Sequence, residues 1–411
     1  MNNKKRFVSN RWVILLLGGL TNAIVVAAPI MGMSVLLPEI SKDLGLSIVQ
    51  AGFVWGIGAL PSIFSSLIAG TLIDRFGAKR IISISCFVIG VLGVSRALST
   101  NYVSLLVTVF LFGFFIPFIS VGNMKNARDW FKDQQLGIAN GILALGMAFG
   151  FFLGSMISAS FISPWVGGWR NTFIFYGVIA IVFMVPWFLT PTVSSSAIPS
   201  SANSSKFSAK ENIQHIIKIN NIWLLGLAFL CVNGAVQGFL GYLPLYLRNS
   251  GWAEIKADTL AASFHFASML FVIPLTLLSD KLGLRKKFIL MTIALTTLGM
   301  GMVGFLNGDV LWLAVFLAGF ARDATMAILF TLTMETKGVG LLYAGISTGF
   351  INVFVGLGSL IFPPLGNNFV VLAPNIPLIF WSVSCLIGLI FVSAIKANPR
   401  LEKEGNKSGL S

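Results

Sequence analysis

The chain has 411 residues, of which 56% are hydrophobic and 10% charged, with 28 Lys and Arg against 14 Asp and Glu. Its mean hydropathy is +0.88. Soluble globular proteins contain about 25% charged residues, so the composition excludes a water-soluble domain. The three cysteines (Cys86, Cys231 and Cys385) lie in apolar runs without metal-site spacing. We therefore expect neither a disulfide framework nor a metal site.

The first apolar stretch, Trp12 to Pro38, is too long for the apolar region of a signal peptide and is expected to remain as a membrane span. A helix needs about 20 apolar residues to cross a bilayer, and the sequence has twelve such runs. They cover residues 12–37, 48–73, 80–98, 102–123, 136–161, 171–190, 221–246, 257–279, 287–306, 309–334, 338–362 and 376–396.

The sixth and seventh runs are separated by the polar segment "PTVSSSAIPSSANSSKFSAKENIQHIIKIN". Its Ser, Ala and Asn content is typical of a flexible linker, and its last residues predict a short surface helix. The sequence therefore predicts an all-α membrane protein with twelve transmembrane helices in two six-helix bundles. The expected bundles are residues 1–190 and 221–411, the second with a short cytoplasmic tail, and 191–220 form a cytoplasmic linker.

The net charge of +14 raises the question of an acidic or nucleic-acid partner. Cytoplasmic loops of membrane proteins collect Lys and Arg. If the N-terminus is cytoplasmic, 22 of the 28 basic residues fall on the cytoplasmic side. We therefore expect both termini in the cytoplasm and no nucleic-acid partner. Arg96 lies near a helix end, where it can reach the membrane surface. Arg322 is the one base that this topology does not explain.

The two halves show weak internal similarity. Trp12 stands ten residues before Asn22 in the first run, and Trp223 stands ten residues before Asn233 in the seventh. Internal repeats of this kind are common in transporter folds.

A short acidic and basic turn occurs once in each half, as "GTLIDRFGAKR" at 70–80 and "TLLSDKLGLRKK" at 276–287. Glycine permits the tight reversal, and the acid at the helix end suits the positive N-terminus of a neighbouring helix. With these turns the chain resembles the major facilitator superfamily. The residues that match the superfamily's signature turn, called motif A, are Gly70, Asp74, Arg75, Gly77, Lys79 and Arg80, with Asp280, Gly283 and Arg285 in a degenerate second copy.

This resemblance implies twelve helices, rocker-type alternating access, and turns that latch the two halves in the outward-facing state. The phrases "GVSRALSTNYVSLLVTVFLFG", "NARDWFKDQQLGIANG" and "FLGYLPLYLRNSGW" are similar to the cyanate permease-like branch and related small-anion porters. The drug/proton antiporter signature is incomplete, because run 136–161 has no Gly-Pro pair. Its regularly spaced glycines, and Gly345 with Gly349, instead predict close helix packing.

Transport requires a polar site near the middle of the membrane, where charged side chains are costly and rare. Arg322 is the strongest candidate, because its planar guanidinium fits a carboxylate or a small oxyanion. The alternative is a structural ion pair. Adjacent helical residues point about 100° apart, so Asp323 is not expected to be its partner. Asp323 itself is expected to form a helix–helix hydrogen bond or to take part in proton or substrate coupling.

Other polar or aromatic candidates for the substrate site are Asn22, Trp55, Asn233, Gln237 and His265. His265 suits proton coupling or substrate contact, since histidine titrates in the physiological range; it would otherwise bond to a neighbouring helix. Asn22 and Asn233 are each expected either to hydrogen-bond the substrate or to join neighbouring helices. Gln237 lies one turn after Asn233 on the same face.

The sequence therefore predicts a monomeric secondary active transporter in the cytoplasmic membrane of a prokaryote. Its expected partners are the lipid bilayer, a small-molecule substrate, organic or inorganic and anionic, and a co-transported proton or ion. No nucleotide-binding signature, cofactor or metal ligand set is evident, and no cluster of catalytic residues predicts an enzyme. The alternatives are a proton-coupled exporter of hydrophobic compounds and a membrane sensor or receptor on a transporter fold.

Overall fold

The computed structural model describes residues 2–131, 134–191 and 209–395. The chain divides into two compact units. Unit 1 comprises Met1–Ala197 and Leu243–His265, and unit 2 comprises Ile198–Tyr242 and Phe266–Ser411. The segment 243–265 thus packs with the first part of the chain. The division into domains 1–190 and 221–411 remains a prediction, and most of the expected linker lies outside the described residues.

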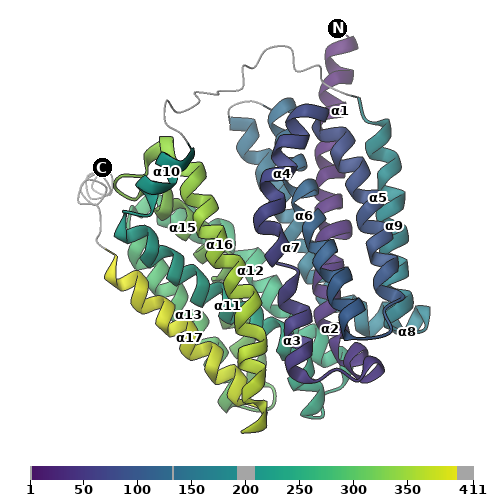
Figure 1. Ribbon diagram of the computed structural model, residues 1–411, viewed down its shortest axis with the longest axis vertical. Coiled ribbons are helices and arrows are strands. Elements are labelled where there is room, and N and C mark those ends of the chain that lie inside the picture. The colour runs from purple at the N-terminus through teal and green to yellow at the C-terminus, as the bar shows by residue number, and fades with distance from the viewer. Residues whose placement is uncertain (1, 132–133, 192–208, 396–411) are drawn as a thin grey trace. The chain divides into compact units, whose positions relative to one another are not determined.

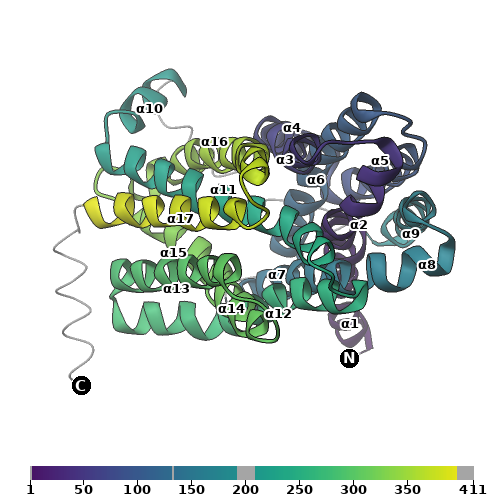
Figure 2. The same cartoon turned by 90° about the horizontal axis from the view of Figure 1, so that it is seen from below.

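Unit 1 is helical throughout its described residues (Figure 1). Its elements are α1 (Asn2–Leu20), the π-helix η1 (Thr21–Ala27), α2 (Ala28–Leu44), α3 (Ile48–Ile57), α4 (Leu60–Phe76), α5 (Ala78–Ala97), α6 (Tyr102–Trp130), α7 (Gln134–Ile157), the π-helix η2 (Ser158–Ile162), α8 (Ser163–Val166) and α9 (Trp169–Leu189). Figure 2 shows α5 between α6 and α9, with which it packs.

Unit 2 is also helical, and it shares two long helices with unit 1. Its elements are α10 (Ala209–Ile216), α11 (Asn220–Asn249), α12 (Glu254–Leu282), α13 (Arg285–Phe305), α14 (Val310–Phe320), α15 (Arg322–Glu335), α16 (Gly340–Asn367), the 3-10 helix η3 (Asn368–Val371) and α17 (Ile376–Ala394). The predicted surface helix is α10, where His215 Nε2 donates to the carbonyl oxygen of Gly338 at 2.8 Å. In unit 2, α13 packs beside α14 and α17.

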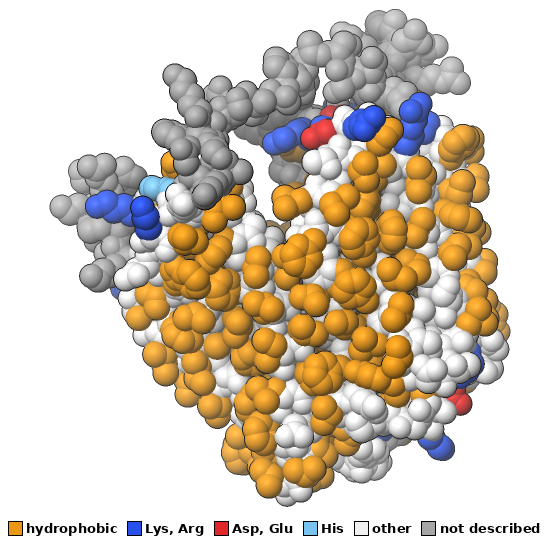
Figure 3. All heavy atoms as spheres, viewed as in Figure 1, with side chains coloured by type: hydrophobic (Ala, Val, Ile, Leu, Met, Phe, Trp, Pro, Cys, Tyr) orange, Lys and Arg blue, Asp and Glu red, His pale blue; other side chains and the backbone are white. Residues whose placement is uncertain are grey.

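The described residues contain twelve helical segments that are long and apolar enough to cross a membrane. The predicted all-α fold with twelve spans is therefore confirmed. Large apolar side chains lie exposed along these segments; Leu67 is 76% exposed and Leu277 62%. Figure 3 shows hydrophobic side chains along the lengths of the helices. Such surfaces suit contact with lipid. The cytoplasmic position of the termini stays a prediction.

Two of the predicted continuous spans are interrupted. The run 48–73 divides into α3 and α4, because Pro61 lies in the first turn of α4, where it lacks an N–H to donate. The run 309–334 divides at Ala321, whose φ of −118° and ψ of 5° depart from helical values. The second interruption directly precedes Arg322.

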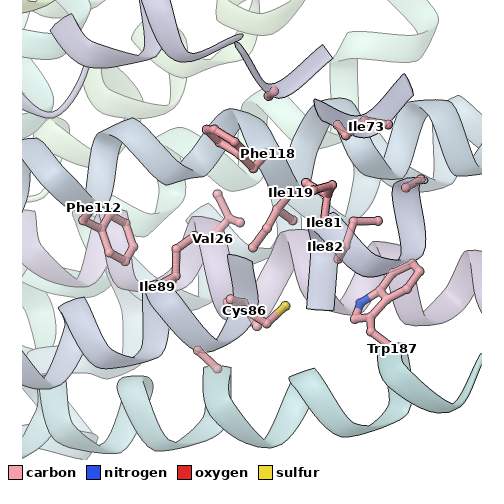
Figure 4. Packing of buried hydrophobic residues seen from close by; sticks show 14 of the residues in the cluster. Val26, Ile73, Ile81, Ile82, Cys86, Ile89, Phe112, Phe118, Ile119 and Trp187 are labelled. Atoms are coloured by element: carbon pink, nitrogen blue, oxygen red, sulfur yellow. The ribbon is translucent and has the colours of Figure 1, made fainter. Parts of the chain in front are cut away.

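A hydrophobic cluster fills unit 1 between η1, α4, α5, α6 and α9 (Figure 4). Ile82, Ile119 and Trp187 are completely buried there. The indole nitrogen Nε1 of Trp187 donates to Thr21 Oγ1 at 2.8 Å. The polar edge of the ring is thus satisfied inside an apolar core, as buried tryptophan requires.

The predicted glycine packing is only partly correct. A methyl group added at Gly150 would lie 2.6 Å from Ala23 Cα, and Gly146 and Gly154 also face the backbone of the first span. In contrast, an added methyl group at Gly137, Gly141, Gly345 or Gly349 would meet no atom within 4 Å. In α16 the close approach falls on Gly358, which faces the carbonyl oxygen of Leu230. Helical spacing alone does not show which glycines face a neighbour.

Candidate functional site

Arg322 is the first residue of α15, directly after the break in its span. After the interruption, α15 begins near the middle of the segment Val310–Glu335. Ala321 precedes this helix without a capping side chain. The first N–H groups of a helix carry partial positive charge and attract anions. A guanidinium and a helix N-terminus therefore share one location in unit 2.

The guanidinium nitrogen Nη1 of Arg322 donates to Asp323 Oδ1. The expectation that these neighbours do not face each other is thus wrong. It assumed that both residues lie inside a continuous helix, where a long side chain leans on the preceding turn. Arg322 has no preceding turn of α15, so its side chain can bend toward the carboxylate. The Arg322 and Asp323 side chains are 20% and 25% exposed.

The pair retains unused hydrogen-bonding capacity. Arg322 Nε is buried and has no hydrogen-bond partner among the described residues. The backbone N–H of Asp323 donates to Ser268 Oγ at 3.1 Å, which ties α15 to α12. This bond uses the backbone of Asp323, so the helix–helix hydrogen bond expected of its side chain stays a prediction, as does its role in coupling. The Nε donor remains available to a further acceptor.

Apolar residues surround this charged pair. Ala321 and Ala324 are buried beside Leu275, and the rings of Phe271 and Phe320 lie 4.2 Å apart, centroid to centroid. Charges interact more strongly in such a low-dielectric setting than in water.

Asn22 lies in η1 of unit 1 and is 5% exposed. Its Nδ2 donates to the carbonyl oxygen of Leu143 at 3.1 Å. Its Oδ1 accepts from Asn123 Nδ2 at 2.7 Å, and Asn123 also donates to the carbonyl oxygen of Gly18 at 3.2 Å. Asn22 therefore joins the first span to α6 and α7, as its alternative role requires.

Asn233 makes the corresponding contacts in unit 2. Its Nδ2 donates to Ser359 Oγ at 2.8 Å and to the carbonyl oxygen of Val355 at 3.2 Å. The first and seventh spans thus each use an asparagine to hold the helix four spans later, α7 or α16. Gln237 lies one turn farther along α11 and is half-buried. Substrate contact by these three residues stays a prediction.

Trp55 and His265 both lie in unit 1, where they are 6% and 5% exposed. Trp55 belongs to α3. The His265 ring lies 5.6 Å from the Phe151 ring and 5.4 Å from the Phe264 ring, centroid to centroid. His265 therefore sits among aromatic side chains, and its coupling or binding role stays a prediction.

The signature turns form ion pairs within each unit. Asp74 Oδ1 accepts from Lys125 Nζ at 2.5 Å, and Gly77 adopts a φ of 86°, which requires glycine. In the second copy, Arg285 pairs with Asp280 at 2.6 Å and with Glu335 at 2.8 Å. Gly283 has a φ of 63°. Both turns therefore contain a glycine with positive φ and an ion-paired acid, although the partners of the acids differ and Gly70 of the first has Thr276 as its counterpart.

The family model described as the Major Facilitator Superfamily matches residues 15–344. The chain belongs to this superfamily. It is 27% identical over 354 residues to the probable nitrate/nitrite antiporter NarK1 of Thermus thermophilus, with 79% of this chain and 78% of the relative covered. It is 22% identical to the probable sulfoacetate transporter SauU of Cupriavidus necator, with 90% and 89% covered.

The fold of this superfamily also recurs in solved structures. The nucleoside transporter NupG superposes with a TM-score of 0.75 at 12% sequence identity, covering 97% of this chain and all of NupG. As a member of this superfamily with transporters among its relatives, the chain is a multi-pass membrane transporter for a small molecule and not an enzyme. The resemblance drawn from the signature turns is confirmed.

Sequence reasoning missed one charged cluster in this superfamily member. Asp258 is completely buried and accepts from Arg248 Nη2 at 2.9 Å and from Ser160 Oγ at 2.6 Å. These residues link η2 to the segment 243–265 of unit 1. The available signal in the sequence was the base Arg248 followed ten residues later by the acid Asp258. Because a buried charge requires a partner, this cluster is structural in character.

Proposed function

We propose that the protein is a secondary active transporter for a small organic or inorganic anion in the cytoplasmic membrane of a prokaryote. Arg322 carries this proposal. It combines a buried donor that no described residue accepts with a position at the N-terminus of an interrupted helix. Interrupted transmembrane helices often direct their N-termini at anionic substrate groups.

The relatives support an anionic substrate. Nitrate, nitrite and sulfoacetate, named for two proteins similar to this chain, are oxyanions with planar or trigonal oxygen groups. A guanidinium can donate to two such oxygens at once. The anion would bind Arg322 in place of, or beside, the carboxylate of Asp323.

Coupling to a proton or ion gradient is part of the proposal. An acidic side chain next to the anchoring arginine provides a group whose charge can offset that of the guanidinium when no anion is bound. Asp323 supplies that group. Displacement of Asp323 by substrate, followed by its neutralisation by a proton or cation, would keep the site electrically balanced.

Uptake by proteoliposomes tests the proposal. Purified protein is reconstituted, and entry of labelled nitrate, nitrite, sulfoacetate and a neutral sugar is followed with and without a proton ionophore. We expect saturable entry of one or more anions and none of the sugar, with accumulation abolished by the ionophore. Protein-dependent entry of the sugar with no anion transport would refute an anion carrier.

A further inference from the structure

Arg96 is a buried cation that lies far from Arg322 in sequence and belongs to unit 1. It lies in the last turn of α5 and is only 2% exposed. The expectation that it reaches the membrane surface is therefore wrong. Its guanidinium carbon instead lies 3.6 Å from the Phe112 ring centroid and 5.4 Å from that of Phe173. Two aromatic rings thus enclose the charge.

No described residue neutralises Arg96. No hydrogen bond or ion pair joins its guanidinium to another described residue, and its Nε is buried and unsatisfied. The carbonyl oxygens of Ala97 and Ser99, which follow Arg96 in the chain, accept from Arg170 at 2.7 Å each, and Arg170 also pairs with Asp43 at 2.8 Å. These acceptors therefore serve Arg170 and not Arg96.

Aromatic faces do not replace a counter-ion. Cation–π attraction offsets part of the lost hydration of a buried guanidinium, but an isolated buried charge remains unfavourable without a charged or hydrogen-bonding partner. The guanidinium group of arginine carries five N–H donors and no acceptor, and it holds its positive charge under ordinary conditions. The surroundings of Arg96 therefore call for an acceptor that the protein does not supply.

A small cavity adjoins the guanidinium. Its lining includes Arg96, Pro29, Ile89, Phe112, Phe173 and Tyr176, and none of its lining residues is acidic. It has about 10 Å³ of space for a water-sized sphere, roughly what one water molecule needs. The phenol of Tyr176 is already hydrogen-bonded to Ser158 Oγ at 2.7 Å. The cavity thus suits a compact, spherical acceptor.

We propose that Arg96 binds a single small monovalent inorganic anion, of about the size of chloride, in this cavity. The charge of Arg96 and its lack of a hydrogen-bonding partner among the described residues favour an anion over a neutral molecule, and the small cavity favours a compact anion. The N-terminus of α9, whose first turns contribute Phe173, adds positive potential. This site does not depend on the proposed transport function, because it uses no residue of unit 2.

Thermal unfolding of the purified full-length protein tests the site. The melting temperature is measured in gluconate, which is too large to enter, against increasing chloride or bromide at constant ionic strength. We expect a saturable upward shift for the wild type and for Lys256→Ala, an exposed control. Arg322→Ala should keep the shift, which separates this site from the proposed substrate site. Arg96→Met should lose it.

Crystals of the wild type grown in bromide provide a measurement that does not depend on how the variant folds. We expect an anomalous bromide peak beside the Arg96 guanidinium. An equal thermal response of wild type and Arg96→Met to halide, or only a water molecule at this position in bromide crystals, would overturn the proposal.

Discussion

Arg322 donates to the carboxylate of Asp323, the next residue in the chain, at the point where α15 begins. Under the proposed function, an incoming anion would meet a guanidinium that already has one acidic partner and one unsatisfied donor, Nε. Asp323 would then compete with the anion for the same charge. The affinity for an anion would therefore depend on the acid as well as on the base.

Asp323→Asn should strengthen anion binding. The amide keeps the size of the side chain but removes the negative charge that competes for Arg322. We expect the Kd measured by isothermal titration to fall about tenfold, corresponding to about 1.4 kcal/mol. Accumulation against a gradient should be lost at the same time if Asp323 takes part in coupling. An unchanged or higher Kd in a well-folded variant would show that the two residues do not compete.

The asparagine bridge between the first span and α6 should contribute to stability. Asn22→Ala and Asn123→Ala each remove one side of a 2.7 Å hydrogen bond. A double-mutant cycle followed by SDS-induced unfolding should give a coupling free energy of ~0.6–1.7 kcal/mol, the range found for hydrogen bonds between membrane helices. Additive single effects would mean that the two amides do not interact. Asn233→Ala with Ser359→Ala is the matched cycle in unit 2.

Neutralising Asp258 should destabilise the protein far more than neutralising its neighbour Glu254. Asp258 is completely buried and paired with Arg248, whereas Glu254 is 58% exposed and lies 3.6 Å from the same arginine. Asp258→Asn leaves a buried cation without its main partner and should cost ~3–5 kcal/mol of unfolding free energy. Glu254→Gln should cost less than ~1 kcal/mol. Similar losses in the two variants, measured by the same SDS titration, would contradict this assignment.

Substitution by alanine should affect stability differently at two glycines of α7. At Gly150 the added methyl group meets the backbone of the first span at 2.6 Å, so Gly150→Ala should lower stability by ~1–3 kcal/mol. At Gly141 it meets nothing within 4 Å, so Gly141→Ala should be neutral or stabilising by up to ~1 kcal/mol. Melting temperatures of the two variants in detergent provide the comparison. Equal changes would mean that the contact at Gly150 is not close.

The fold was largely predictable because each membrane span is a continuous apolar stretch of the sequence. Twelve apolar runs, a polar segment after the sixth, and paired turns around Asp74 and Asp280 each depend on local sequence. The interruptions within two of the spans were harder to predict from the sequence. Pro61 indicated the helix break before α4, whereas no residue in the sequence around Ala321 indicates the helix break before α15. Its non-helical backbone appears only in the structure, and it reverses the expectation for Arg322 and Asp323.

The candidate site was predictable by residue type but not by partner. The scarcity of charges in the apolar runs singled out Arg322. Sequence could not show that Asn22 is engaged by Asn123, 101 positions away, or that Arg96 lies under Phe112 and Phe173. Such contacts depend on which faces of distant helices meet. Polar residues in a span therefore identify candidates, and only the packing separates a binding group from a bridge between helices.

Transport by Arg322 variants tests the central claim most directly. Initial rates of anion uptake into proteoliposomes are compared for wild type, Arg322→Lys, Arg322→Ala and the exposed control Lys256→Ala, with equal reconstitution checked by immunoblot. The account predicts that Arg322→Ala loses at least about 100-fold in kcat/KM, that Arg322→Lys retains partial activity because it keeps the charge but not the planar fork, and that Lys256→Ala matches wild type. Uptake by Arg322→Ala at the wild-type KM and kcat would contradict it.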